Sequence, residues 1–145
     1  MEDKTVLSAM EILNHTLHSC FYSGNFNLHA TICSKMIDLT MKHGISKYSC
    51  FGLCSFAVVL CNNGDKSSYD IGKLALKLLE KSNSKEMMPM VNTCFFGLIS
   101  PYFASMHSSI VPMARTTCVS FEIGLHHCRA STAGGYAKFA FLCGT

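Results

Sequence analysis

The sequence predicts an all-α fold of about six or seven helices, stacked as antiparallel hairpins into a solenoid-like fragment. Apolar residues recur at helical spacing in successive segments, and short turns containing Gly, Asn or Ser separate these segments. Of the 145 residues, 49% are apolar and 14% are charged, well below the ~25% charge of a typical globular chain. The chain is therefore expected to bury a core, as one domain spanning residues 1–145.

Two amphipathic segments open the chain. Residues 4–22 place apolar side chains on one face, and a turn at Ser23-Gly24 ends the segment. The next stripe runs over residues 28–43, and either Asn25 or Asn27 is its expected N-cap. These segments form the first expected hairpin.

The next two segments differ in the distribution of their apolar residues. Residues 47–62 are apolar almost all round, which is typical of a helix buried between two layers. Residues 67–81 form the clearest amphipathic helix, after a turn at Asn63-Gly64. We expect the apolar stripe of the second helix to pack on the first: Ile71, Leu74, Ala75, Leu78 and Leu79 against Phe56, Val59 and Leu60.

Proline and glycine mark the helices of the second half. Residues 85–105 form a helix that Pro101 is expected to kink or break near Ile99 or Ser100, because proline lacks the backbone donor and clashes with the preceding turn. Ser108 or Ser109 is the expected cap of a further helix with Pro112 in its first turn. Residues 130–143 form a last, weaker helix.

The segments pair into hairpins near 4–43, 47–82 and 85–127, and the partial helix 130–143 follows. This spacing of ~40 residues is typical of helical-hairpin repeats. Between Met87 and Thr145 only four Asp, Glu, Lys or Arg residues occur, too few for the solvated outer face of a free domain. We therefore expect the chain to be a fragment of a longer protein.

The second hairpin resembles a divergent tetratricopeptide repeat. Ala57, the turn Gly64-Asp65, and Ala75-Leu76 match that family's small helix-A residue, turn and helix-B pair, although the family's tryptophan and terminal proline are missing. The resemblance implies that six residues pack the repeats together: Ala57, Gly64, Ala75, Leu76, Leu78 and Leu79.

Residues 26–128 also resemble the helical region of large signalling proteins. These proteins join an AAA-type or STAND-type ATPase module and tetratricopeptide-like helices to protein kinase, sensor histidine kinase or nucleotide cyclase domains. The chain contains no phosphate-binding loop and no kinase motif, so no catalytic or cofactor-binding residue carries over. The resemblance implies a noncatalytic scaffold that contacts other domains of the parent protein or a protein partner.

A second hypothesis is an autonomous module that binds a small apolar ligand. Its site would be a groove between hairpins, and the aromatic side chains Phe95, Phe96, Tyr102 and Phe103 would line it. Flanking sequence with a phosphate loop, kinase or cyclase domain would favour the scaffold.

The sequence gives only weak support for a metal site or for a nucleophilic cysteine. The candidate zinc ligands lack the spacing of a zinc knuckle, and the candidate thiol nucleophiles lack an activating signature, so packing is the preferred interpretation for the cysteines. The residues concerned are His15, His18, Cys20, Cys50, Cys54, Cys118, His126, His127 and Cys128. We expect no metal, no cofactor and no enzyme activity within this chain.

The net charge and the hydropathy of the chain indicate which partners and which cellular compartment to expect. The net charge is only +3, and no basic run is present that would track nucleic acid. The longest apolar stretch, residues 48–61, is shorter than the ~20 residues of a membrane span. The polar N-terminus and the cysteines within apolar runs favour a reducing, cytoplasmic setting.

Two surfaces are candidate contact sites. Lys73, Lys77 and Lys81 recur at i, i+4 and i+8, and this ridge would suit an acidic partner. Residues 137–143 are apolar apart from Lys138, and we expect this uncapped C-terminal edge to self-associate or to be covered by further repeats.

Overall fold

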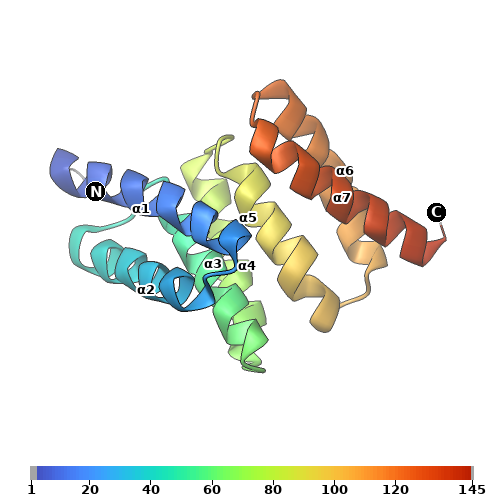
Figure 1. The fold of residues 1–145 in the computed structure, drawn as a ribbon, viewed down its shortest axis with the longest axis horizontal. Coiled ribbons are helices and arrows are strands. Elements are labelled where there is room, and N and C mark those ends of the chain that lie inside the picture. The colour runs from blue at the N-terminus through green and yellow to red at the C-terminus, as the bar shows by residue number, and fades with distance from the viewer. Residues whose placement is uncertain (1–2, 145) are drawn as a thin grey trace.

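The computed structural model describes residues 3–144, and in this range the fold is all-α with seven α-helices and no strand. This confirms the predicted all-α class, whereas the solenoid-like stacking of hairpins stays a prediction (Figure 1). The helices are α1 (Lys4–Ser23), α2 (Phe26–His43), α3 (Ser49–Asn62), α4 (Ser67–Ser82), α5 (Met88–Cys94), α6 (His107–Glu122) and α7 (His126–Cys143). A π-helical turn, η1 (Phe95–Ile99), and a 3-10 turn, η2 (Ser100–Tyr102), join α5 to α6.

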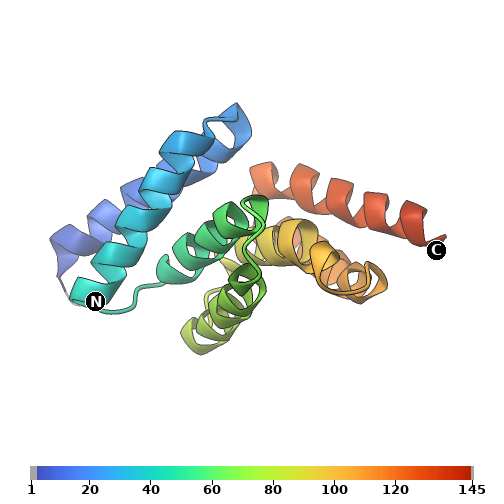
Figure 2. The ribbon, with the colours of Figure 1, turned by 90° about the horizontal axis from the view of Figure 1, so that it is seen from below.

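Neighbouring helices pack in chain order. Helix α1 contacts α2, α2 contacts α3, α3 packs extensively on α4, and α6 packs extensively on α7. Helix α5 lies in the middle and contacts α3, α4, α6 and α7. Seen from below, the α1–α2 pair and α7 rise on the same side of the central helices, so that side of the molecule is concave (Figure 2).

The turn between α1 and α2 follows from two residues. Gly24 has a φ of 73°, and its N–H and that of Asn25 donate to the carbonyls of Phe21 and Cys20 in a Schellman arrangement. The Asn25 side chain then accepts the N–H of Leu28 at 3.2 Å and caps α2. Of the two expected caps, Asn25 is the one used.

Helix α3 is buried along most of its length, as its apolar circumference predicts. Ala57 and Cys54 are fully buried, and Gly52 approaches α2 so closely that an added Cβ would lie 3.0 Å from Cβ of Met36. On α4, Ala75 and Leu79 are buried and Ile71 and Leu78 are half-buried against the core.

The prediction that Leu74 belongs to this stripe is wrong. Leu74 is 49% exposed, and it is absent from the residues packed against the core. The apolar stripe of α4 is therefore narrower than its sequence indicates, with Ala75 rather than Leu74 at its centre.

The chain widens before Pro101 rather than kinking at it. Residues Phe95–Ile99 form a π-helical turn in which the N–H of Ser100 donates to the carbonyl of Phe95. This wider turn accommodates a proline that would clash with the carbonyl four residues earlier in a regular α-helix. The expected break near Ile99 or Ser100 is thus a change of helix type that begins at Phe95.

The second half differs from prediction at two helix starts. Helix α6 begins at His107, before both expected caps, so Pro112 lies inside the helix rather than in its first turn. Helix α7 begins at His126 and continues through Gly134-Gly135. Gly135 permits a close approach, because an added Cβ there would lie 2.6 Å from Cε of Met113 on α6.

The burial of α4 yields a matched pair of stability predictions. Leu79→Ala removes a side chain that is 8% exposed and should lower the free energy of unfolding by about 2–4 kcal/mol. Leu74→Ala should change it by no more than about 1 kcal/mol, because this side chain is half exposed. Urea unfolding followed by circular dichroism measures both; equal effects would contradict this placement of α4.

Candidate ligand-binding cleft

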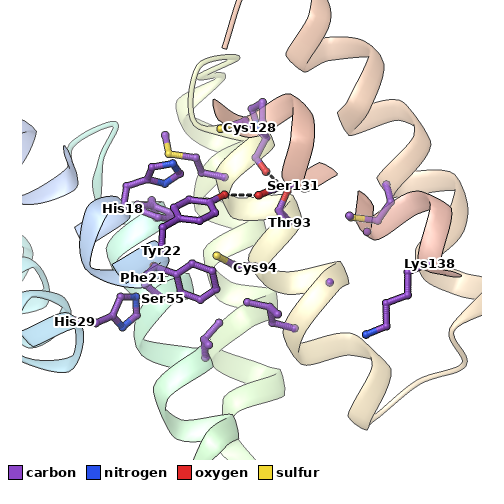
Figure 3. A pocket seen from close by; sticks show the side chains of 18 of the residues that line it. His18, Phe21, Tyr22, His29, Ser55, Thr93, Cys94, Cys128, Ser131 and Lys138 are labelled. Atoms are coloured by element: carbon purple, nitrogen blue, oxygen red, sulfur yellow. Dashed lines mark hydrogen bonds between the residues drawn. The ribbon is translucent and has the colours of Figure 1, made fainter. Parts of the chain in front are cut away.

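A cleft of about 240 Å³ lies on the concave side of the fold (Figure 3). Helices α1, α3, α5 and α7 supply most of its wall. The described lining residues are His18, Phe21, Tyr22, His29, Phe51, Ser55, Val58, Pro89, Met90, Thr93, Cys94, Gly97, Leu98, Met113, Cys128, Ser131, Gly135, Lys138 and Phe139. Most of these side chains are apolar or aromatic, which is the usual lining of a site for small molecules.

Aromatic rings form the wall on the α1 side. The His18 ring lies edge-on to Tyr22 at 4.9 Å between ring centroids and 6.4 Å from Phe51. Phe21 lies 5.6 Å from Tyr22 and 5.8 Å from His29. Rings arranged in this way hold one another in place, so this wall is preorganised.

A hydrogen bond between two lining residues links α1 to α7 at the cleft. The Tyr22 and Ser131 hydroxyls are bonded to each other, joining α1 to α7 across 109 residues of sequence (Figure 3). The Schellman turn at Gly24 ends α1 directly after Tyr22 and Ser23, which fixes the hydroxyl near this rim.

Small residues create the space inside the cleft. Gly97 lies in the π-helical turn, and an added Cβ there would meet only Cγ2 of Thr93, at 4.0 Å. Ser55 on α3 and Gly135 on α7 also line the cleft without bulk. The sequence analysis missed this site, although small residues at these positions were a signal that could have been followed.

Burial disfavours the thiolate form of one cysteine that lines the cleft, Cys128, and of two core cysteines, Cys33 and Cys54. It raises the pKa of Cys33 to about 12 and that of Cys128 to about 11. A hydrogen bond from Cys94 and burial together raise the pKa of Cys54 well above its ordinary value, and the Cys54 thiol donates to the carbonyl of Val91 at 3.5 Å. Nucleophilic thiols need the opposite shift.

His29 is a neutral group in the wall. It is buried, and burial lowers its pKa below the ordinary value. Its Nδ1 lies 3.8 Å from Sγ of Cys33, one turn further along α2. His29 therefore adds a polar surface to the cleft without adding positive charge at neutral pH.

The residues expected to pack the repeats lie in different environments. Ala57, Ala75 and Leu79 are buried, whereas Leu76 and Leu78 are half-buried against the core. Gly64 is exposed, and its φ of 78° closes the turn between α3 and α4. None of these residues lines the cleft.

The lysine ridge lies on the exposed face of α4. Lys73 pairs with Asp70 at 2.8 Å, and its Nζ lies 4.7 Å from the centroid of the Tyr69 ring. Lys77 and Lys81 are exposed. The ridge faces solvent, and the positive charge of Lys73 is already partly compensated by Asp70.

The expected aromatic groove does not form. Phe95 is buried in the core, and its ring stacks on the ring of Tyr69. The ring of Phe103 also stacks on Tyr69, at 5.2 Å between centroids. Tyr102 is 75% exposed. Phe96 borders a separate, more open groove between α4 and α6, so none of the four aromatic residues lines the cleft.

The candidate metal and nucleophile residues are dispersed. Among the residues whose side chains are described, no group of three His, Cys, Asp or Glu is placed to hold a metal ion. Cys50 and Cys54 are core residues, and Cys118 is exposed on α6. The side chains of His126 and His127 lie outside the described part of the structure.

Comparisons of the chain with known protein families, with curated proteins and with solved structures found no match. The resemblance to tetratricopeptide-like regions of signalling proteins therefore stays a prediction. Within residues 3–144, no helix combines the length and the apolar character needed to cross a membrane.

The bridge between α1 and α7 can be tested by a double-mutant cycle. Tyr22→Phe and Ser131→Ala each remove one hydroxyl, and the coupling energy between them should be about 0.5–1.5 kcal/mol, the net contribution of one hydrogen bond. Thermal or urea unfolding of the wild type, the two single variants and the double variant measures it. Strictly additive effects would show that the hydroxyls do not interact.

Proposed function

We propose that this chain is a noncatalytic helical module that binds a small apolar molecule in the cleft between α1, α3, α5 and α7. The observation that carries the proposal is the cleft itself, which is lined mostly by apolar and aromatic side chains and contains the Tyr22–Ser131 hydrogen bond in its wall. The sequence also led to a ligand-binding hypothesis, but it placed the site at the aromatic residues near Phe95. The site proposed here is the cleft instead.

The size of the cleft limits its occupant. An apolar cavity of about 150 Å³ can hold one benzene ring, and this cleft measures about 240 Å³. One ring with a short alkyl extension, or a short acyl chain, is the size that fits.

The chemistry around the cleft supports binding rather than catalysis. The pKa of the Cys128 thiol is raised and the pKa of His29 is lowered, so these two lining groups are neutral at pH 7. A neutral wall suits an apolar molecule. Buried, unpaired thiols such as Cys33 are compatible with the reducing, cytoplasmic setting that we propose.

The C-terminal edge favours a second candidate function, a scaffold that contacts other domains of a signalling protein or another copy of the chain. Phe141 is 85% exposed and Leu142 is 56% exposed at the end of α7. Large apolar side chains exposed together at the end of a helical stack are typical of a surface covered by a neighbouring element. The ridge of Lys73, Lys77 and Lys81 is a second surface available to such a scaffold.

Phenylbutanol, which carries one ring and a short chain, is a suitable neutral probe of the cleft. We expect saturable binding to the purified chain in calorimetry, and Gly97→Leu should abolish it by filling the space beside Thr93. Gly134→Leu is the matched control, because Gly134 is exposed and lies outside the cleft. Circular dichroism establishes that both variants fold.

Thr93→Leu fills the same space from α5 and is the second filling variant in case Gly97→Leu disturbs the π-helical turn. Absence of probe binding to the wild type would overturn the proposed function. Unchanged binding to a folded Gly97→Leu or Thr93→Leu variant would also overturn it.

The C-terminal edge can be tested by sedimentation under reducing conditions. The chain should associate as its concentration rises, and Phe141→Glu should shift it toward monomer, because a charge on this exposed side chain disfavours burial in a contact. Val111→Glu, at an exposed position on α6, is the control. A wild-type chain that stays monomeric over the whole range would contradict association through this edge.

A further inference from the structure

We propose that the ligand of the cleft is an amphipathic monoanion, an aromatic or short acyl body that ends in a carboxylate, with its charged group at Lys138. This inference rests on the proposed function and adds the chemical class of the ligand.

Lys138 is the one Lys, Arg, Asp or Glu among the described residues that line the cleft. It is exposed, and it forms no ion pair with any residue between 3 and 144. Lysines elsewhere in the fold are paired where an acid is near: Lys42 with Asp38 at 3.1 Å and Lys47 with Glu86 at 3.0 Å. Lys138 therefore has an ammonium group available to a ligand.

The position of Lys138 gives the ligand a direction. Figure 3 shows its side chain extending from α7 toward the ribbon of α5 and the π-helical turn, away from the Tyr22–Ser131 bridge. Ser131 and Lys138 are seven residues apart on α7, so helix geometry separates them by about 10 Å. A molecule with its apolar end beneath the bridge would carry its polar end to Lys138.

One lysine indicates a monoanion. An ammonium group is a single point charge, whereas phosphate sites are commonly built from several donors, such as a planar arginine fork or a helix N-terminus. No arginine lines the cleft, so Lys138 is the one Lys or Arg side chain among the described lining residues. A carboxylate carries one negative charge and therefore matches a single ammonium group.

The apolar body and the charged group act on different parts of the site. The body replaces water against the rings of Phe21, Tyr22 and Phe51, and this burial supplies most of the affinity. The carboxylate stays at the exposed rim, where it retains much of its hydration and gains a modest attraction to Lys138. The charge therefore selects among ligands of equal apolar size.

The test compares phenylbutyrate with phenylbutanol, which share a ring and chain and differ in the charge of the end group. Calorimetry at low salt should give the carboxylate an affinity about twofold to fivefold higher than the alcohol. Lys138→Gln should remove this preference and leave the affinity for the alcohol unchanged, while Lys138→Arg should keep it. Lys77→Gln, an exposed lysine outside the cleft, is the control.

Added salt provides a further readout, because an ion pair at an exposed rim is screened. The preference of the wild type for the carboxylate should shrink as salt rises, whereas binding of the alcohol should not weaken. Equal binding of both probes to the wild type, or a preference that survives Lys138→Gln, would overturn the assignment of an anionic ligand and leave the apolar cleft standing. Binding of neither probe would overturn the proposed function together with this inference.

Discussion

The apolar circumference of α3 is the constraint on which the rest of the structure depends. A helix that is apolar almost all round must be covered on several sides, and α3 is in contact with α2, α4, α5 and the π-helical turn. Gly52 lets α2 approach one side closely, and Gly72 on α4 admits the ring of Phe95, from which an added Cβ would lie only 2.6 Å. The helices on either side are arranged around this central element.

The cleft is a result of this arrangement. Helices α3 and α5 lie side by side and contact each other, while the α1–α2 hairpin and α7 rise beside them on the concave face (Figure 2). Part of the space between is not filled, because Ser55 and Gly97 are small residues of the cleft wall, and an added Cβ at Gly97 would meet only Thr93, at 4.0 Å. Small residues thus let helices approach closely at Gly52 and Gly135 and leave space at Gly97.

Local patterns predict much of the fold, whereas the cleft depends on contacts that are remote in sequence. Gly24 and Asn25 mark the end of α1 and the start of α2 because the turn uses only neighbouring residues. Leu74 is misassigned because periodicity does not show how wide a stripe the neighbouring helix covers. The π-helical turn is missed because Pro101 indicates a disruption without fixing its form, and Tyr22 meets Ser131 through the packing of several helices.

The contact between Tyr22 and Ser131 also bears on how the chain folds. In an open array of hairpins each unit touches only its neighbours, so the ends can fray independently and folding can begin anywhere. A contact between the first and last helices adds a long-range closure, whose entropic cost grows slowly with the length of chain enclosed. The two ends are thereby coupled, and loss of either α1 or α7 would leave the other without its partner across the cleft. This one hydrogen bond thus links α1 and α7 at a single point, in addition to the more extensive contacts between neighbouring helices.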